Sequence, residues 1–178
     1  MSIIVIALVI VGIVLAILAL GAKRHWLVIG PAAVVALVVV GTALAPPLGQ
    51  PPWAAVAIGI GFSAIGVLGG SPVVALVLRF AQGGVQLGSH GGIVVEDDAP
   101  HGREILRGGA TIGYLERFAL IGAVIAGQGA AVALIVAVKG LGRFSELDDS
   151  RARERFIIGT LTSLCWAGVC VAAAILAS

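Results

Sequence analysis

Charged residues are scarce in this 178-residue chain, in which Asp, Glu, Lys and Arg together make up 11% of the sequence. Soluble domains carry roughly 25% of these residues. Hydrophobic residues make up 60% of the chain, and its mean hydropathy is +1.14. A soluble protein of this composition would lack the polar side chains needed to cover its surface. The composition therefore excludes a soluble domain and predicts an integral membrane protein.

Three further absences narrow the class of protein. The apolar runs lack the alternation of apolar and polar residues that is typical of a membrane β-barrel, so we expect an all-α protein whose helices satisfy their own backbone. The formal net charge is only +2 and no Lys/Arg-rich polar face exists, which argues against binding of nucleic acid. Cys165 and Cys170 are the only cysteines and lie five residues apart in one apolar run, which favours neither a disulfide nor a metal site.

Five apolar runs have the length of a transmembrane helix, which needs about 20 residues. They cover residues 3–20, 27–44, 53–78, 118–138 and 156–176. The first run is followed, not preceded, by its basic residues, so we interpret it as an uncleaved span and not as a signal peptide. We predict about five transmembrane helices, of which the last two form an antiparallel hairpin.

The third run is longer than the ~30 Å hydrocarbon core requires. Gly69, Gly70, Ser71 and Pro72 lie within it, and both glycine and proline weaken a helix. Two interpretations stay open: one tilted or kinked helix, or a broken helix that re-enters the side it came from.

The membrane orientation depends on that choice, because cytoplasmic loops carry an excess of Lys and Arg. Five simple crossings divide the 11 basic residues six against five, which does not fix the orientation. A re-entrant third run divides them seven against four and leaves the acidic loop outside.

The spans divide the chain into three parts. Residues 1–81 are expected to form an apolar bundle of three spans, residues 82–113 a glycine-rich polar loop, and residues 114–178 a two-helix hairpin module with a charged connector at 139–155. His90 and His101 lie near acidic residues of the loop, but their spacing matches no familiar metal-ligand pattern. We therefore expect a solvated loop without a metal.

The connector at 139–155 contains both signs of charge, and Ser150 is placed to cap the last helix. It is either a plain charged link or a site that contacts lipid headgroups or a docking partner. In the second interpretation the contacting residues are Lys139, Arg143, Phe144 and Arg151.

Gln128 lies at the midpoint of the fourth run. Lipid offers an amide no hydrogen-bond partner, so we expect Gln128 to face another helix, another subunit or water. It either bonds a neighbouring backbone carbonyl or hydroxyl group, or it lines a water-filled or substrate-contacting site.

Small residues recur at every fourth position in the last two runs, which is typical of closely packed membrane helices. We predict helix packing at Gly122, Ala126, Ala130 and Gly159. The candidate pore-lining or interhelical polar residues are Gln128, Glu116, Arg117, Thr160 and Ser163. Glu116 and Arg117 are adjacent and cannot share a helix face, so we expect one to pair within the protomer and the other across an interface.

Several polar positions form an ordered pattern over residues 108–175. The pattern contains Ile112-Gly113 and Leu115-Glu116-Arg117, then Gly127-Gln128, then Lys139, Arg143-Phe144 and Glu146-Leu147, and finally Ile158-Gly159-Thr160-Leu161 and Ser163. It resembles the helical hairpin that closes several uncharacterised bacterial membrane proteins, with motifs IGxLER, GQ, KxxxRFxEL and IGTLxS. The resemblance implies a recurring module and a bacterial origin, and it implies no activity.

The function expected from these features is that of an oligomeric, uncoupled pore or channel-like transport protein in the bacterial cytoplasmic membrane. The alternative is a non-catalytic scaffold or interaction subunit of a membrane complex. Its expected partners are the lipid bilayer and either further copies of itself or another membrane protein. No cofactor is expected, and an enzyme is disfavoured because no His, Asp or Glu lies inside any of the five runs.

Overall fold

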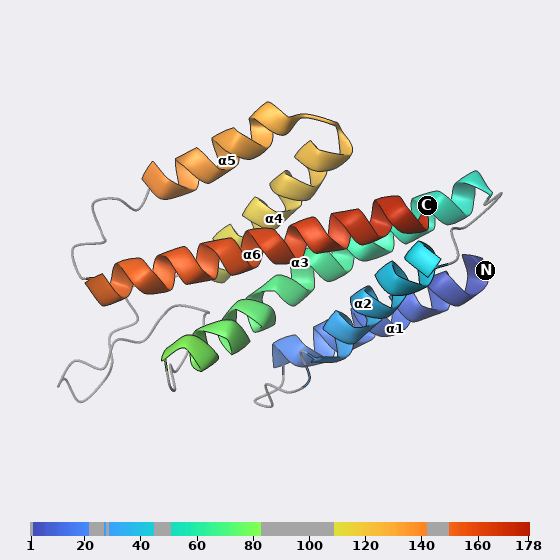
Figure 1. Cartoon of the computed structure of the whole chain (residues 1–178), viewed down its shortest axis with the longest axis horizontal. Coiled ribbons are helices and arrows are strands. Elements are labelled where there is room, and N and C mark those ends of the chain that lie inside the picture. The colour runs from blue at the N-terminus through green and yellow to red at the C-terminus, as the bar shows by residue number, and fades with distance from the viewer. Residues whose placement is uncertain (1, 22–26, 28, 45–50, 83–108, 142–149) are drawn as a thin grey trace.

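The computed structural model describes residues 2–21, 27, 29–44, 51–82, 109–141 and 150–178, and in this part of the chain it contains helices and no strands (Figure 1). The helices are α1 (Ser2–Gly21), α2 (Ile29–Leu44), α3 (Pro52–Gln82), α4 (Gly109–Ile125), α5 (Gly129–Leu141) and α6 (Ser150–Ala177). The predicted all-α class is confirmed for these residues.

Three of the helices, α1, α3 and α6, are long and apolar enough to cross a membrane. The helices α2 and α5 are apolar but shorter. Large apolar side chains cover the outer surface, and Ile60 and Phe118, for example, are 67% and 69% exposed. Exposed apolar side chains in such number suit a helical protein that is solvated by lipid.

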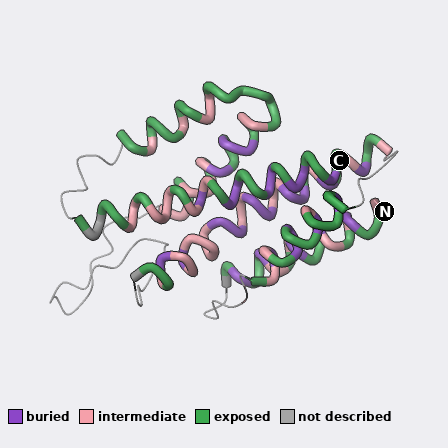
Figure 2. Tube along the Cα trace, in the orientation of Figure 1, coloured by how far each residue is buried: buried purple, intermediate pink, exposed green. Residues whose placement is uncertain are grey.

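The centre of the molecule is the contact between α3 and α6, which run antiparallel. Gly66 of α3 lies against Cys170 of α6, and Gly69 lies against the ring of Trp166. Figure 2 shows the buried residues concentrated along these two helices and along the sides of α1 and α2 that face them. Because both glycines lack a side chain, the two helix backbones can approach closely.

The helices α1 and α2 pack on the first half of α3. Gly61 of α3 lies against Val9 of α1, and Gly12 of α1 lies against Ile65 of α3, so α1 and α3 run in the same direction. The next helix, α2, returns antiparallel to α1, with Gly30 against Leu15. One apolar core therefore includes residues of α1, α2, α3 and α6, and it joins the predicted segments 1–81 and 114–178.

The third apolar run is a single continuous helix. It begins at Pro52, whose missing N–H costs nothing at the first helical position. It continues through Gly69, Gly70, Ser71 and Pro72 to Gln82. The first of the two open interpretations, an unbroken helix, is therefore confirmed, and re-entry by a break at these residues is wrong.

The fourth apolar run, in contrast, is not one helix, so the prediction of a single span over 118–138 is wrong. Gly127 has a φ of +67°, a conformation that glycine adopts without strain. Its N–H donates to the carbonyl of Val124, and the N–H of Gln128 donates to that of Ala123. This paired bonding beyond a left-handed glycine is the Schellman motif, which ends α4 and turns the chain back into α5.

The hairpin therefore forms within the fourth run and not between the last two runs. The helix α4 is antiparallel to α3, with Ile121 beside Gly66 and Arg117 beside Gly70. Since α6 is also antiparallel to α3, α4 and α6 run in the same direction. The antiparallel hairpin predicted for the last two runs is thus replaced by a hairpin of α4 and α5.

The left-handed conformation of Gly127 makes a direct test of the turn possible. We expect Gly127→Ala to lower the free energy of unfolding by about 1–2 kcal/mol, because a Cβ is disfavoured in this conformation. The measurement is helix content against temperature in detergent. Gly129→Ala is the matched control, since Gly129 begins α5 and a Cβ there meets nothing within 4 Å. Equal stability of the two variants would show that the run does not turn at Gly127.

Candidate functional site

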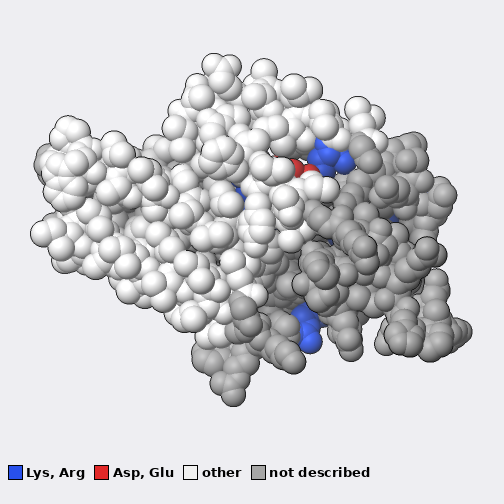
Figure 3. Space-filling view, turned by 180° about the vertical axis from the view of Figure 1, so that it is seen from behind, with Lys and Arg blue, Asp and Glu red and all other residues white. Residues whose placement is uncertain are grey.

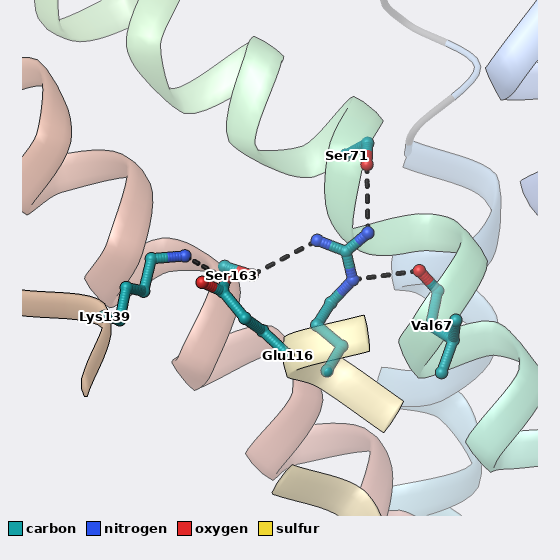
Figure 4. Close-up of polar contacts among 6 residues, drawn as sticks. Val67, Ser71, Glu116, Lys139 and Ser163 are labelled. Atoms are coloured by element: carbon teal, nitrogen blue, oxygen red, sulfur yellow. Dashed lines mark hydrogen bonds and ion pairs between the residues drawn. The ribbon is translucent and has the colours of Figure 1, made fainter. Parts of the chain in front are cut away.

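Arg117 of α4 is buried where α4 meets α3 and α6, and only 3% of its surface is exposed. Its Nε donates to the backbone carbonyl of Val67 at 2.9 Å. Nη2 donates to the hydroxyl of Ser71 at 2.9 Å, and Nη1 donates to the hydroxyl of Ser163 at 3.2 Å (Figure 4). The guanidinium therefore links three helices, and hydrogen bonds from a charged group contribute about 1.5–3 kcal/mol each.

The sequence of α3 leaves space for this side chain. A Cβ on Gly70 would lie 2.5 Å from Cδ and Nε of Arg117, so only glycine fits there. Pro72, two residues later, has no N–H to donate to the carbonyl of Leu68, which weakens the backbone bonding of this turn. The guanidinium reaches the neighbouring carbonyl, that of Val67. The glycines and proline of this segment therefore allow a close approach instead of breaking the helix.

A second donor contacts the same stretch of α3 from the other long helix. Nε1 of Trp166 donates to the carbonyl of Ile65 at 3.3 Å, and its ring lies over Gly69. Two side chains, from α4 and α6, thus bond the backbone of one helix within three residues. Such interhelical bonds specify how apolar helices pack, because apolar contacts alone are similar in many registers.

Glu116 lies next to Arg117 in sequence but pairs elsewhere. Its carboxylate forms an ion pair with Lys139 of α5, and both side chains are largely buried. The prediction that Glu116 and Arg117 point in different directions holds. Both have partners within the chain, and pairing of either one across an interface stays a prediction. The pair also brings the two ends of the fourth run together, which a single span would keep apart.

The polar contact of Arg117 lies inside the apolar part of the molecule. Ser71 precedes Arg79 by eight residues on α3, and Ser163 follows Arg155 by eight residues on α6. At about 1.5 Å per residue, the guanidinium of Arg117 lies about 12 Å from those arginines along the helix axes. Beyond it, the hairpin continues for two more turns of α4 before it reaches Gly127.

Gln128 is exposed at the turn between α4 and α5. Its carbonyl accepts the N–H groups of Ala131 and Val132 and so starts α5. Its side chain is not packed between helices of the same chain, so an interhelical role within one copy is not supported. Contact with water, a second copy or another protein stays a prediction.

The small residues of the two stripes lie in different surroundings. Gly122, Ala126 and Ala130 are exposed, and a Cβ on Gly122 would meet nothing within 4 Å, so they do not pack helices together within one chain. Gly159 of α6 does face α3, where a Cβ would lie 3.5 Å from Val74. Ser163, one turn further along α6, is the buried acceptor of Arg117, whereas Thr160 is half-buried.

The other candidates of the connector and loop are only partly covered. Lys139 is placed by its ion pair, whereas Arg143 and Phe144 lie outside the described residues, as do the three histidines. Arg151 belongs to α6, but its side chain is outside what the structure describes. Within the described part, no group of three or more His, Cys, Asp or Glu side chains is placed to hold a metal ion.

Sequence reasoning did not identify Ser71, Gly70 or the carbonyl of Val67 as partners of Arg117. The available signal was the Gly-Gly-Ser-Pro stretch at 69–72, which we interpreted as a possible helix break. Glycines beside a serine also mark a close approach between membrane helices. The partner that makes this approach lies 46 residues away in sequence, so the pairing could not be deduced from local pattern.

No protein-family model, curated protein or solved structure matches this chain.

The fit of Arg117 against Gly70 predicts the effect of a single methyl group. We expect Gly70→Ala to destabilise the protein by about 1–3 kcal/mol, because the new Cβ overlaps the guanidinium and displaces it from Val67. Gly59→Ala, on the same helix, is the control, since a Cβ there meets nothing within 4 Å. Thermal unfolding in detergent compares the two. If Gly70→Ala loses no more stability than Gly59→Ala, the placement of Arg117 is contradicted.

Proposed function

We propose that this chain is a multi-pass membrane protein in which α1, α2, α3 and α6 cross the bilayer and α4–α5 is a hairpin that enters and leaves on one side. Four crossings replace the five predicted from sequence. The lengths of α1, α3 and α6 support three of them. The shorter α2 lies antiparallel along α1, within the same core, which supports the fourth. The ion pair between Glu116 and Lys139 supports return of the hairpin to the side it entered.

This arrangement places every basic residue on one side of the membrane. The ends of α1, α3 and α5 and the starts of α2, α4 and α6 share one end of the molecule (Figure 1). All 11 Lys and Arg residues lie near these ends or in the segments that join them, apart from the buried Arg117 just inside. Figure 3 shows the described charges between the middle of the visible face and that end, and none at the other end.

The excess of Lys and Arg assigns this end to the cytoplasm. The start of α1, the segment between α2 and α3 and the end of α6 then face the opposite side, and they contain no Lys or Arg. Five crossings would divide the Lys and Arg residues six against five between the two sides of the membrane. In the proposed topology the fourth run does not cross the membrane, so this division no longer applies. We propose the bacterial cytoplasmic membrane as the location, which rests on the resemblance stated above.

Cysteine labelling distinguishes this topology from five crossings. In a background of Cys165→Ala and Cys170→Ala, we expect Gln86→Cys and Leu147→Cys to react with a membrane-impermeant maleimide from the same side, and Leu48→Cys from the opposite side. Labelling is measured in intact and permeabilised cells. Reaction of positions 86 and 147 from opposite sides would mean that the fourth run crosses the membrane and that the proposed topology is wrong.

The biochemical function that we propose is an uncoupled pore built from several copies of the chain. The observation that carries it is the exposed turn at 126–128, which lies deeper in the apolar part of the molecule than Arg117. Non-helical backbone at membrane depth persists only where protein covers it or where water fills a cavity. No helix in the described part of the chain covers this turn, so a second copy, water or both would do so. Gln128 would then line the path.

The absence of coupling is supported by the placement of the acidic groups. Glu116 and Glu154 are the only acidic residues within the six helices, and Glu154 belongs to the first turns of α6. Glu116 is engaged by Lys139. A proton-coupled transporter relies on an embedded carboxylate that binds and releases a proton. Glu116 is instead held as a partner of a fixed cation.

A second candidate function is a non-catalytic interaction subunit, and the surroundings of α5 favour it. None of the residues of α5 is buried, although several of them are glycine or alanine. Small residues on a helix face allow another membrane helix to approach closely. Here the hairpin would pack against another membrane protein, and Gln128 would bond to it without lining a path.

Two polar contacts offer a reason for the resemblance to the bacterial hairpin module. They are formed by Glu116, Arg117, Lys139 and Ser163. These four residues belong to the motifs IGxLER, KxxxRFxEL and IGTLxS. Three helices bring them into two adjacent polar contacts. We propose that the motifs recur because these contacts hold the hairpin in place.

One substitution separates the two functions. We expect Gln128→Leu to lower ion flux through proteoliposomes while the assembly keeps its size in detergent, because the amide lines the path without holding the copies together. Flux and oligomer size are both measured. Thr42→Val is the control, since the Thr42 hydroxyl bonds only carbonyls of its own helix, those of Val38 and Val39. Loss of the assembly would favour the interaction subunit, and absence of flux in the unmutated protein would exclude the pore.

A further inference from the structure

A hollow of about 270 Å³ lies along the first turns of α6, and it is lined by Ser150, Arg153, Glu154, Ile157 and Ile158. These positions recur every three or four residues, so they share one side of the helix over a length of about 12 Å. The volume is below the roughly 300–1,000 Å³ of pockets that enclose a whole drug-sized ligand. The hollow therefore suits one part of a larger molecule whose remainder lies outside it.

The lining side of α6 points away from the centre of the molecule. At 3.6 residues per turn it is opposite Gly159 and Trp166, which contact α3. Four of the five lining residues are exposed, and Ile157 exposes 49% of its surface. In a membrane protein, this side of α6 faces lipid and not α3.

The hollow changes in polarity along α6. Arg153 and Glu154 carry opposite charges, whereas Ile157 and Ile158, one turn further along the helix, are apolar. The segment of α6 that is apolar enough to cross a membrane is Arg153–Ala177. The two charges therefore lie where this segment begins, and the isoleucines lie just inside it. A phospholipid has the same order of groups, a charged headgroup followed by apolar acyl chains.

We propose that this hollow binds one zwitterionic phospholipid with an ammonium headgroup, of the phosphatidylethanolamine type. Arg153 binds the phosphate, Glu154 accepts hydrogen bonds from the ammonium, and one acyl chain packs on Ile157 and Ile158. A headgroup with both signs of charge complements the adjacent cation and anion. An anionic headgroup such as that of phosphatidylglycerol offers Glu154 no cation.

The topology proposed above assigns this lipid to the cytoplasmic leaflet. Binding itself requires only that the chain is a membrane protein, and it depends neither on the orientation nor on a pore. Failure of the labelling or flux experiments therefore leaves the lipid site standing, and failure of the lipid experiments leaves the topology and the pore standing.

Binding is measured on the purified full chain in detergent micelles, through the unfolding temperature. Phosphatidylethanolamine and phosphatidylglycerol with the same acyl chains are added separately. We expect a saturable rise that occurs at lower concentration with phosphatidylethanolamine, because a ligand that binds only the folded state stabilises it. A rise at equal or lower concentration with phosphatidylglycerol would indicate general attraction to basic residues and overturn the proposal. So would an unfolding temperature that phosphatidylethanolamine does not change.

The variant Glu154→Gln tests recognition of the headgroup. We expect its apparent affinity for phosphatidylethanolamine to fall by about two- to fivefold, because an exposed ion pair contributes little. Its affinity for phosphatidylglycerol should not fall. Unfolding without added lipid shows whether the variant is folded. If folded Glu154→Gln keeps the full preference for phosphatidylethanolamine, Glu154 does not bind the ammonium and the proposal is wrong.

The variant Ile157→Ala tests contact with the acyl chain. We expect it to weaken the apparent affinity for phosphatidylethanolamine by about threefold or more, because apolar contact is lost. The matched control is Ile175→Ala, since Ile175 belongs to the same helix and is 60% exposed at its other end. Equal affinities of the two variants would show that the lipid does not lie along this hollow.

Discussion

The position of the α4–α5 hairpin depends on the contacts of Arg117 with α3 and α6. The outer surface of this protein is apolar, and apolar helices in lipid gain little from one packing register over another. Only 3% of the surface of Arg117 is exposed, so its guanidinium must find acceptors in the protein. This restricts the hairpin to the register at which Val67, Ser71 and Ser163 are all within reach. Specific polar contacts thus select one packing register, which apolar contacts alone do not do.

The same contact explains the composition of the middle of α3. Two glycines, a serine and a proline in succession are poor for helix stability. Gly69 and Gly70 admit Trp166 and Arg117 to the backbone, and Ser71 supplies an acceptor. The helix remains continuous because it is long and is packed on several sides by α1, α4 and α6. Residues of low helix propensity therefore occur in α3 where neighbouring helices approach it closely.

The hairpin also determines how charge is distributed. A fourth run that crossed the bilayer would place the basic residues of 139–155 opposite those of the first loop. By turning at Gly127, the chain returns them to one end of the molecule. If this end is cytoplasmic, no loop on the other side carries a basic residue, so the charges of the connections and the fold of the hairpin support a single orientation.

The sequence by itself determined the all-helical class and the approximate positions of α1, α2, α3 and α6, because hydrophobicity over about 20 residues reflects the thickness of the hydrocarbon core directly. It also contained the signal that ends α4, a glycine at Gly127 beside Gln128, but the surrounding apolar residues favoured one long span.

Only the tertiary structure decided that the side chain of Arg117 is buried, that Glu116 pairs with Lys139, and that the guanidinium packs against Gly70. These contacts join residues 23 to 50 positions apart in sequence, and no periodicity within one helix encodes them. The hydrophobic pattern of a segment depends on that helix and its solvent alone. Which side chains contact each other depends on which helices the fold brings together.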